Sequence, residues 1–177
     1  SSEFDSSCDL SYIADNVEGA TQFAFDKAPV VMIDKRLNEP ALRKRRRMTI
    51  AHEVGHILAH HSLFQPSSSS MMELFTDLEG YSPVYCLRQA IERGNDWMEW
   101  QASYVGAALL MRRDAVIETL ALVQKPPLPI ALSTLAAQAM IKKVADAFEV
   151  SFDAARIRLI ELRLLESHEL IQRLPLA

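Results

Sequence analysis

The spacing of apolar residues along the chain predicts a short β-hairpin followed by a long helix. Residues 21–25 (TQFAF) and 30–34 (VVMID) are rich in β-branched and aromatic side chains and flank a turn-like segment, so we expect them to pair as strands. From about Met48 the apolar positions recur every three or four residues, at Ile50, Val54, Ile57 and Leu58. This spacing is typical of an amphipathic helix with one apolar stripe.

Turn-forming residues divide the rest of the chain. The segment from Gln65 to Arg93 contains QPSSSS and EGYSP, and we expect a loop with short helices there. Residues 96–111 predict one helix that ends near a cluster of charged residues. The proline-rich residues 124–131 (QKPPLPIA) predict a connector, because proline cannot continue a helix.

The C-terminal section has the pattern of two amphipathic helices. They are expected at residues 132–148 and 152–165, with Ser151 as the N-cap of the second. The fold class is therefore α+β, mostly helical with a small antiparallel sheet. We expect a core at residues 1–123 and a helical section at 124–177, which has a helix-turn-helix cadence and packs on that core.

The composition is that of a globular protein and does not indicate a particular function. With 49% hydrophobic and 24% charged residues and a net charge of -4, the 177-residue chain resembles an ordinary globular domain. No apolar run approaches the roughly 18 residues of a membrane span, and the polar start lacks a secretory signal, so we expect a cytoplasmic protein. Cys8 and Cys86 are too few for a disulfide framework and are interpreted as thiols.

Four of the five histidines lie in residues 49–61 (TIAHEVGHILAHH). His52 and His56 are four residues apart in the HEVGH pattern, so on a helix both imidazoles project toward one point, which suits a zinc ion. Glu53 is offset by about 100° around the helix, beside the metal, where it can polarise a water molecule. His60 is about 12 Å along the helix from His52, and we expect it to support the site rather than to bind metal. His61 is interpreted as the polar end of the helix.

A catalytic zinc site needs a third protein ligand. Glu99 in the second predicted helix is the best candidate, because its neighbours Ala102, Ser103 and Gly106 are small or polar and would let the two helices approach. Glu92 and Asp96 are rivals, although acidic residues are also favoured by the dipole at a helix start. The alternative to a metal site is a helix that carries histidine and glutamate as solvated polar residues.

Several segments together resemble the ImmA/IrrE-type metallopeptidases. They are, in order, PVVMID, RRMTIAHEVGHILAH, EWQASYVGAALLM and VADAFEVSFDAARIRLIEL, within residues 29–165. The resemblance implies a small zincin-like (minigluzincin) core, Zn²⁺ bound by His52, His56 and Glu99, and Glu53 as general base. It also implies cleavage of a helix-turn-helix repressor, in a stress or mobile-element response.

The chain departs from the family pattern at two positions. Ser103 stands where the family usually has Asn or Asp four residues after the third ligand, and Arg112 stands where it usually has proline. A serine hydroxyl can still orient a histidine ligand. The segment from Gln65 to Arg93 is also long for the family, which bears on substrate specificity. Tyr81, Tyr85, Tyr104 and His60 are all candidate donors to an oxyanion.

Two rival functions share these features. The cations of residues 43–47 (RKRRR) and the cadence of the C-terminal helices would suit a DNA-linked regulator, with weak or indirect contact to nucleic acid. We prefer to interpret residues 43–47 as a solvated loop, with docking of an acidic partner as the alternative. We expect Ile157, Leu159, Ile160 and Leu164 to face the core. The other rival is a zinc-sensing protein with a degenerate protease site.

Overall fold

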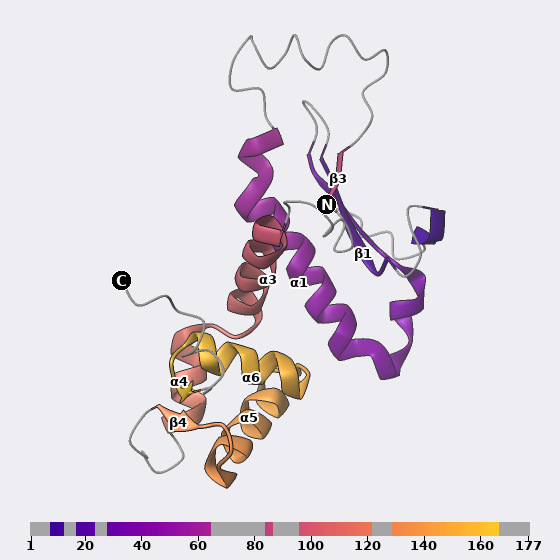
Figure 1. The fold of residues 1–177 in the computed structure, drawn as a ribbon. Helices are drawn as coiled ribbons and strands as arrows, with labels where there is room; N and C mark the ends of the chain where they lie inside the picture. Colours follow the sequence, from indigo (N-terminus) through magenta and orange to yellow (C-terminus); the bar gives the residue numbers. More distant parts are fainter. Residues whose placement is uncertain are drawn as a thin grey trace, which may run out of the picture. The chain divides into compact units, whose positions relative to one another are not determined.

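The described residues between positions 19 and 86 contain a small antiparallel sheet (Figure 1). The computed structural model describes residues 8–12, 17–23, 28–64, 84–86, 96–121 and 129–166. Strand β1 (Gly19–Phe23) is central and pairs with β2 (Val30–Ile33) and with β3 (Val84–Cys86). Thr21 lies opposite Val31 on one side and Cys86 on the other. The predicted hairpin is confirmed, although β1 begins two residues early and residues 24 and 25 lie outside the described part.

The prediction for residues 65–93 was wrong at strand β3. It lies in the segment from Gln65 to Arg93, where we expected a loop with short helices, and the rest of that segment lies outside the described residues. A strand of only three residues is too short to show the alternation of apolar and polar residues that identifies a strand in a sequence. The strand exists through its pairing with β1, more than 60 residues earlier in the chain, which no local pattern indicates.

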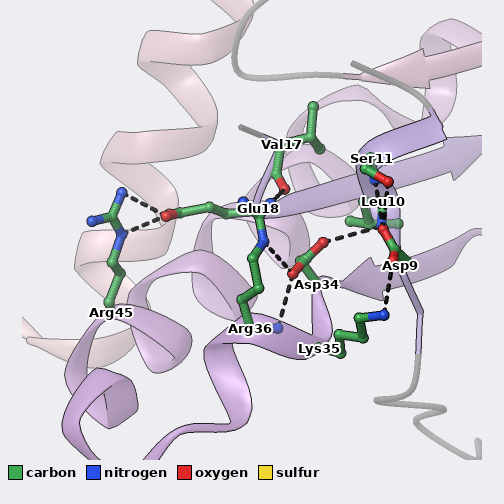
Figure 2. A network of polar contacts seen from close by, with 9 residues as sticks. All are labelled: Asp9, Leu10, Ser11, Val17, Glu18, Asp34, Lys35, Arg36 and Arg45. Carbon is green, nitrogen blue, oxygen red and sulfur yellow. Dashed lines mark hydrogen bonds and ion pairs between the residues drawn. The ribbon is translucent and has the colours of Figure 1, made fainter. Parts of the chain in front are cut away.

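The buried carboxylate of Asp34 ties the start of the chain to the sheet (Figure 2). It accepts hydrogen bonds from the backbone N–H of Leu10 at 3.0 Å and from the backbone and Nε of Arg36 at 2.8 and 2.7 Å. Arg36 in turn donates from Nη2 to the carbonyl of Val17 at 2.8 Å. Asp34 also caps the short helix η2 (Lys35–Asn38), which follows the hairpin.

Helix α1 (Arg43–His60) follows a second short helix, η3 (Pro40–Leu42), and is succeeded by η4 (His61–Phe64). It starts five residues before Met48, so the basic run is the first turns of the helix and not the loop we expected. Arginine and lysine are good helix formers, although cations are unfavourable near a helix N-terminus. Arg45 is held by Glu18, with 2.8 Å between Nε and Oε2 (Figure 2).

The buried face of α1 is its polar face. The apolar stripe of Ile50, Val54, Ile57 and Leu58 is only partly buried, and Leu58 is 62% exposed. The buried residues of the helix are instead Thr49, Ala51, His52, Glu53, Gly55, His56 and His60. Because ionisable side chains are rarely buried without partners, this reversal points to a polar site beneath the helix.

Helix α3 (Asp96–Leu110) crosses α1 at very short range. A Cβ on Gly55 would lie 2.3 Å from the carbonyl oxygen of Ala102, and one on Gly106 would lie 2.7 Å from that of Ala51. The two glycines therefore let each backbone touch the other. The predicted helix and the predicted approach of the two helices are confirmed.

Residues 1–106 and 107–177 form two compact units. The second contains α4 (Arg113–Ala121), where no helix was predicted, then α5 (Leu135–Ala147) and α6 (Phe152–Glu161). Strands β4 (Ile130–Ala131) and β5 (Leu165–Glu166) pair in parallel. The division into core and C-terminal section at residue 123 stays a prediction.

Local signals set the ends of the C-terminal helices. The Ser151 hydroxyl accepts a hydrogen bond from the N–H of Ala154, which confirms the predicted N-cap. Helix α6 ends four residues earlier than expected, and Arg163 has a positive φ of 57°. Leu159 and Leu164 are buried as expected and Ile160 is partly buried, but Ile157 is half exposed. Among the described helices, none combines the length and the apolar character that crossing a membrane requires.

Candidate metal centre

Three side chains from α1 and α3 converge on one buried point. The Nε2 atoms of His52 and His56 are 3.1 Å apart, and they lie 3.1 and 3.2 Å from the two carboxylate oxygens of Glu99. One ligand atom from each residue lies within 4.8 Å of the others. The three residues that the sequence analysis selected as metal ligands are thus brought together. Glu92 and the side chain of Asp96 lie outside the described part.

The chemistry of these donors fits a divalent cation. Two imidazole nitrogens and a carboxylate are one of the donor sets found in catalytic zinc sites. Burial raises the pKa of Glu99, but hydrogen bonds from His52 and His56 outweigh burial and lower it to about 2. The carboxylate is therefore ionised at neutral pH. A buried cluster of electron-pair donors is costly unless a positive charge compensates it.

Each imidazole is also held at its other nitrogen. His52 Nδ1 lies 3.1 Å from the Ser103 hydroxyl, so the serine makes the contact that the sequence analysis considered for it. His56 Nδ1 lies 3.2 Å from Nδ1 of the buried His60, which is where a residue that supports the cluster would lie. Contacts of this kind fix the ring orientation of metal-binding histidines.

Glu53 is buried beside the cluster, with 1% of its surface exposed. The Thr21 hydroxyl in β1 lies 2.7 Å from Glu53 Oε2 and 3.1 Å from the Glu53 carbonyl oxygen. A Cβ on Gly19 would lie 2.8 Å from Glu53 Oε1, so the glycine leaves space for the carboxylate. Burial raises the pKa of Glu53, although the Thr21 hydroxyl and both imidazoles act in the opposite direction.

Three residues of this site were not predicted from the sequence. Thr21 was predicted only as a strand residue, Gly19 precedes the predicted strand, and Gln101 lies between Glu99 and Ser103 in α3. Gln101 accepts at Oε1, 3.0 Å from His60 Nε2. A polar residue within an otherwise apolar helix next to Glu99 is the one signal that could have identified Gln101.

The candidate oxyanion donors have different surroundings. Both ring nitrogens of His60 face other side chains of the site. Tyr104 is 40% exposed and stacks on Trp100, with ring centroids 5.5 Å apart. Tyr81 and the side chain of Tyr85 lie outside the described residues. His61 follows α1, and its ring stacks on Phe23 at 6.3 Å, in accord with its expected place at the helix end.

Comparison with known proteins adds one match. The Peptidase_M78 family model, described as the IrrE N-terminal-like domain, matches residues 7–160. No curated protein matches the chain.

Proposed function

The chain belongs to the peptidase family of the IrrE N-terminal-like domain, and from this premise we propose that it is a zinc-dependent endopeptidase. The family gives it a metallopeptidase-type function. The observation that supports zinc binding is the buried cluster of His52, His56 and Glu99, whose potential ligand atoms lie within 4.8 Å of one another. The observation that supports hydrolysis is the separate buried carboxylate of Glu53.

The residues divide the chemistry between binding and proton transfer. Zinc, when bound by His52, His56 and Glu99, would supply a Lewis acid that polarises a carbonyl and activates water. Glu53 is suited to take a proton from the attacking water and pass it to the leaving amine. Its pKa is raised toward neutral pH, and a general base works best when its pKa lies near the pH of the reaction. Thr21 holds the carboxylate in place while the proton moves.

The proposed substrate is a helix-turn-helix transcriptional repressor, cleaved in the cytoplasm in a stress or mobile-element response. The support for this substrate is the resemblance to ImmA/IrrE-type proteases, whose segments fall within the matched residues. Nothing in the described side chains selects a particular repressor.

The DNA-linked alternative gains little from the structure. Helix α6 has an acidic residue, Asp153, in its first turn, where a DNA-reading helix would favour cations. The basic residues 43–47 are the start of α1, and one of them, Arg45, is neutralised by Glu18.

The function is tested by separating metal binding from catalysis. Zinc content and cleavage of purified helix-turn-helix repressors from the source organism are measured for wild type, Glu53→Gln and Glu99→Ala. We expect about one zinc per chain in wild type and Glu53→Gln, and a clear loss in Glu99→Ala. Cleavage should fall roughly 10²- to 10⁴-fold in Glu53→Gln, because the general base is removed. Undiminished cleavage by Glu53→Gln would refute the assignment, and wild-type protein that stays zinc-free would favour the DNA-linked regulator over both zinc-dependent functions.

A further inference from the structure

The start of helix α1 concentrates positive charge in a chain whose net charge is negative. Five of the 19 lysines and arginines stand together at residues 43–47, whereas the whole chain carries a net charge of -4. These residues form the first turns of α1, where cations are unfavourable beside the positive end of the helix dipole. The stability of the helix therefore does not explain this run of cations.

The five cations differ in their contacts. Three of them have interaction partners, namely Arg43, Arg45 and Arg47. Figure 2 shows the ion pair of Arg45 with Glu18. Lys44 and Arg46, by contrast, make no hydrogen bond or ion pair within the part of the chain that the structure describes. These two side chains are available to a binding partner.

Arg46 lacks the acceptor that its side chain is built to bind. The side chain is partly buried, and among the described residues its Nε is a buried donor without a hydrogen-bond partner. A buried donor without a partner is unfavourable, and a guanidinium group can bind both oxygens of one carboxylate. Lys44 is exposed two positions away and adds a second positive charge.

The same helix carries the candidate metal centre. Arg46 and Glu53 are seven residues, or two turns, apart, so they lie on one face of α1, about 10.5 Å apart along its axis. An extended peptide covers about 3.3–3.6 Å per residue. A peptide whose scissile bond lies beside Glu53 can therefore reach Arg46 with a residue about three positions away.

We propose that Lys44 and Arg46 form a docking site for an acidic segment of the protein substrate. The inference rests on the proposed peptidase function and adds the charge of the substrate near the cleaved bond. Carboxylates of that segment would pair with the ammonium group of Lys44 and the guanidinium group of Arg46. Nucleic acid fits less well, because its affinity grows with the number of phosphates that are neutralised, and in the described part of the run two cations lack a partner.

The test measures the binding of an acidic probe to the full chain. Fluorescence anisotropy follows a fluorescein-labelled polyglutamate peptide, without added zinc, with wild type and with the double variant Lys44→Ala/Arg46→Ala. We expect the double variant to bind about 5- to 30-fold more weakly, as for the loss of two ion pairs near the surface. Added salt should also weaken the binding to wild type. Unchanged affinity in the double variant, or wild type that does not bind the peptide, would overturn the proposal.

Two controls separate docking from general charge and from folding. Lys142→Ala/Arg156→Ala removes two cations of the second unit and should stay within about twofold of the wild-type affinity. The Tm of Lys44→Ala/Arg46→Ala should equal or exceed that of wild type, because alanine favours a helix and cations are unfavourable at its start. Equal weakening in both double variants, or a clearly lower Tm for Lys44→Ala/Arg46→Ala, would overturn the proposal.

Duplex DNA is the second probe. If DNA bound more tightly than polyglutamate and lost this affinity in Lys44→Ala/Arg46→Ala, the surface would belong to a nucleic-acid site, and the proposal would be wrong. We expect the acidic peptide to bind more tightly than DNA.

Zinc content and kinetics distinguish this inference from the proposed function. With a repressor that wild type cleaves, Lys44→Ala/Arg46→Ala should keep its zinc and its kcat, and its KM should rise about 5- to 30-fold. An unchanged KM would overturn the assignment to the substrate. Wild type that holds no zinc but binds polyglutamate through Lys44 and Arg46 would overturn the peptidase function and leave the docking site standing, because the anisotropy measurement needs no zinc.

Discussion

Glu53 is a carboxylic acid held almost entirely away from water, and one hydroxyl of β1 contacts it. Thr21 lies 2.7 Å from its carboxylate and is itself fully buried. If a buried carboxylate loses its hydrogen-bond donor, the folded state carries the full free-energy cost of removing that carboxylate from water. Thr21 therefore both stabilises the fold and fixes the position of the proposed general base.

We predict that Thr21→Val lowers the free energy of unfolding by about 1–3 kcal/mol, because the isosteric change removes the donor and leaves the carboxylate buried. Because Glu53 is no longer held, kcat should fall more than KM changes. Thr21→Ser, which keeps the hydroxyl, is the matched control and should retain most of both quantities. Chemical denaturation and steady-state kinetics measure the two effects, and a Thr21→Val enzyme with normal kcat would contradict the positioning role.

Asp34 makes stability depend on pH. Burial raises its pKa, but the hydrogen bonds from Arg36 and Leu10 outweigh burial and hold the pKa below its usual value. An acid whose pKa is lower in the folded state stabilises the fold above its unfolded pKa, about 3.9, and loses that contribution as the pH falls further.

We predict that Asp34→Asn destabilises the protein by about 1.5–3 kcal/mol at pH 7, the usual value for hydrogen bonds to a charged group. The difference from wild type should shrink as the pH falls below about 3.9, the unfolded pKa, because the wild-type carboxylate loses its charge in increasingly acidic solution. Urea denaturation at several pH values measures it. Asp146→Asn breaks only an exposed ion pair with Lys142 and should change stability by less than about 1 kcal/mol. A pH-independent difference would contradict the role of the charge.

At the scale of elements, the crossing of α1 and α3 builds the candidate metal centre. His52 and His56 come from one helix and Glu99 from the other, so the separation of the helices sets the distance between ligands. Gly55 and Gly106 are the two points where the backbones touch.

Gly55→Ala tests this crossing. Alanine normally stabilises a helix interior by about 0.5–1 kcal/mol relative to glycine, but here its Cβ would meet a backbone oxygen at 2.3 Å. We predict a net destabilisation of about 1–3 kcal/mol and a marked loss of zinc affinity as Glu99 moves away. Leu58→Ala, on the exposed side of α1, is the control for the helix itself. A Gly55→Ala protein more stable than wild type would refute the close crossing.

At the scale of the whole molecule, metal binding should be linked to folding. The ligands are assembled only in the native state, because Glu99 is more than 40 residues from the two histidines. An ion that binds the folded but not the unfolded chain stabilises it, by about 2.7 kcal/mol at 100 times the Kd.

We therefore predict that zinc raises the Tm of the wild-type protein and that a chelator reverses the rise. Glu99→Ala should show little zinc-dependent change, since one of three ligands is lost. Differential scanning calorimetry with and without zinc measures this. An equal rise in Tm for both proteins would place the stabilising zinc elsewhere.

Local sequence determined the features that depend on neighbouring residues. The four-residue spacing of His52 and His56, the offset of Glu53 and the cap at Ser151 follow from helix geometry, whatever surrounds them. The hairpin likewise joins segments less than ten residues apart. The metal-ligand and general-base roles themselves stay predictions.

Only the tertiary structure decided which face of α1 is buried, because a helix buries the side that its partners cover. The apolar stripe predicted one face, and the sheet and α3 cover the other. It also placed Thr21 against Glu53 and Gln101 against His60, across 32 and 41 positions of sequence. Such contacts depend on the packing of whole elements, and no periodicity along the chain encodes them.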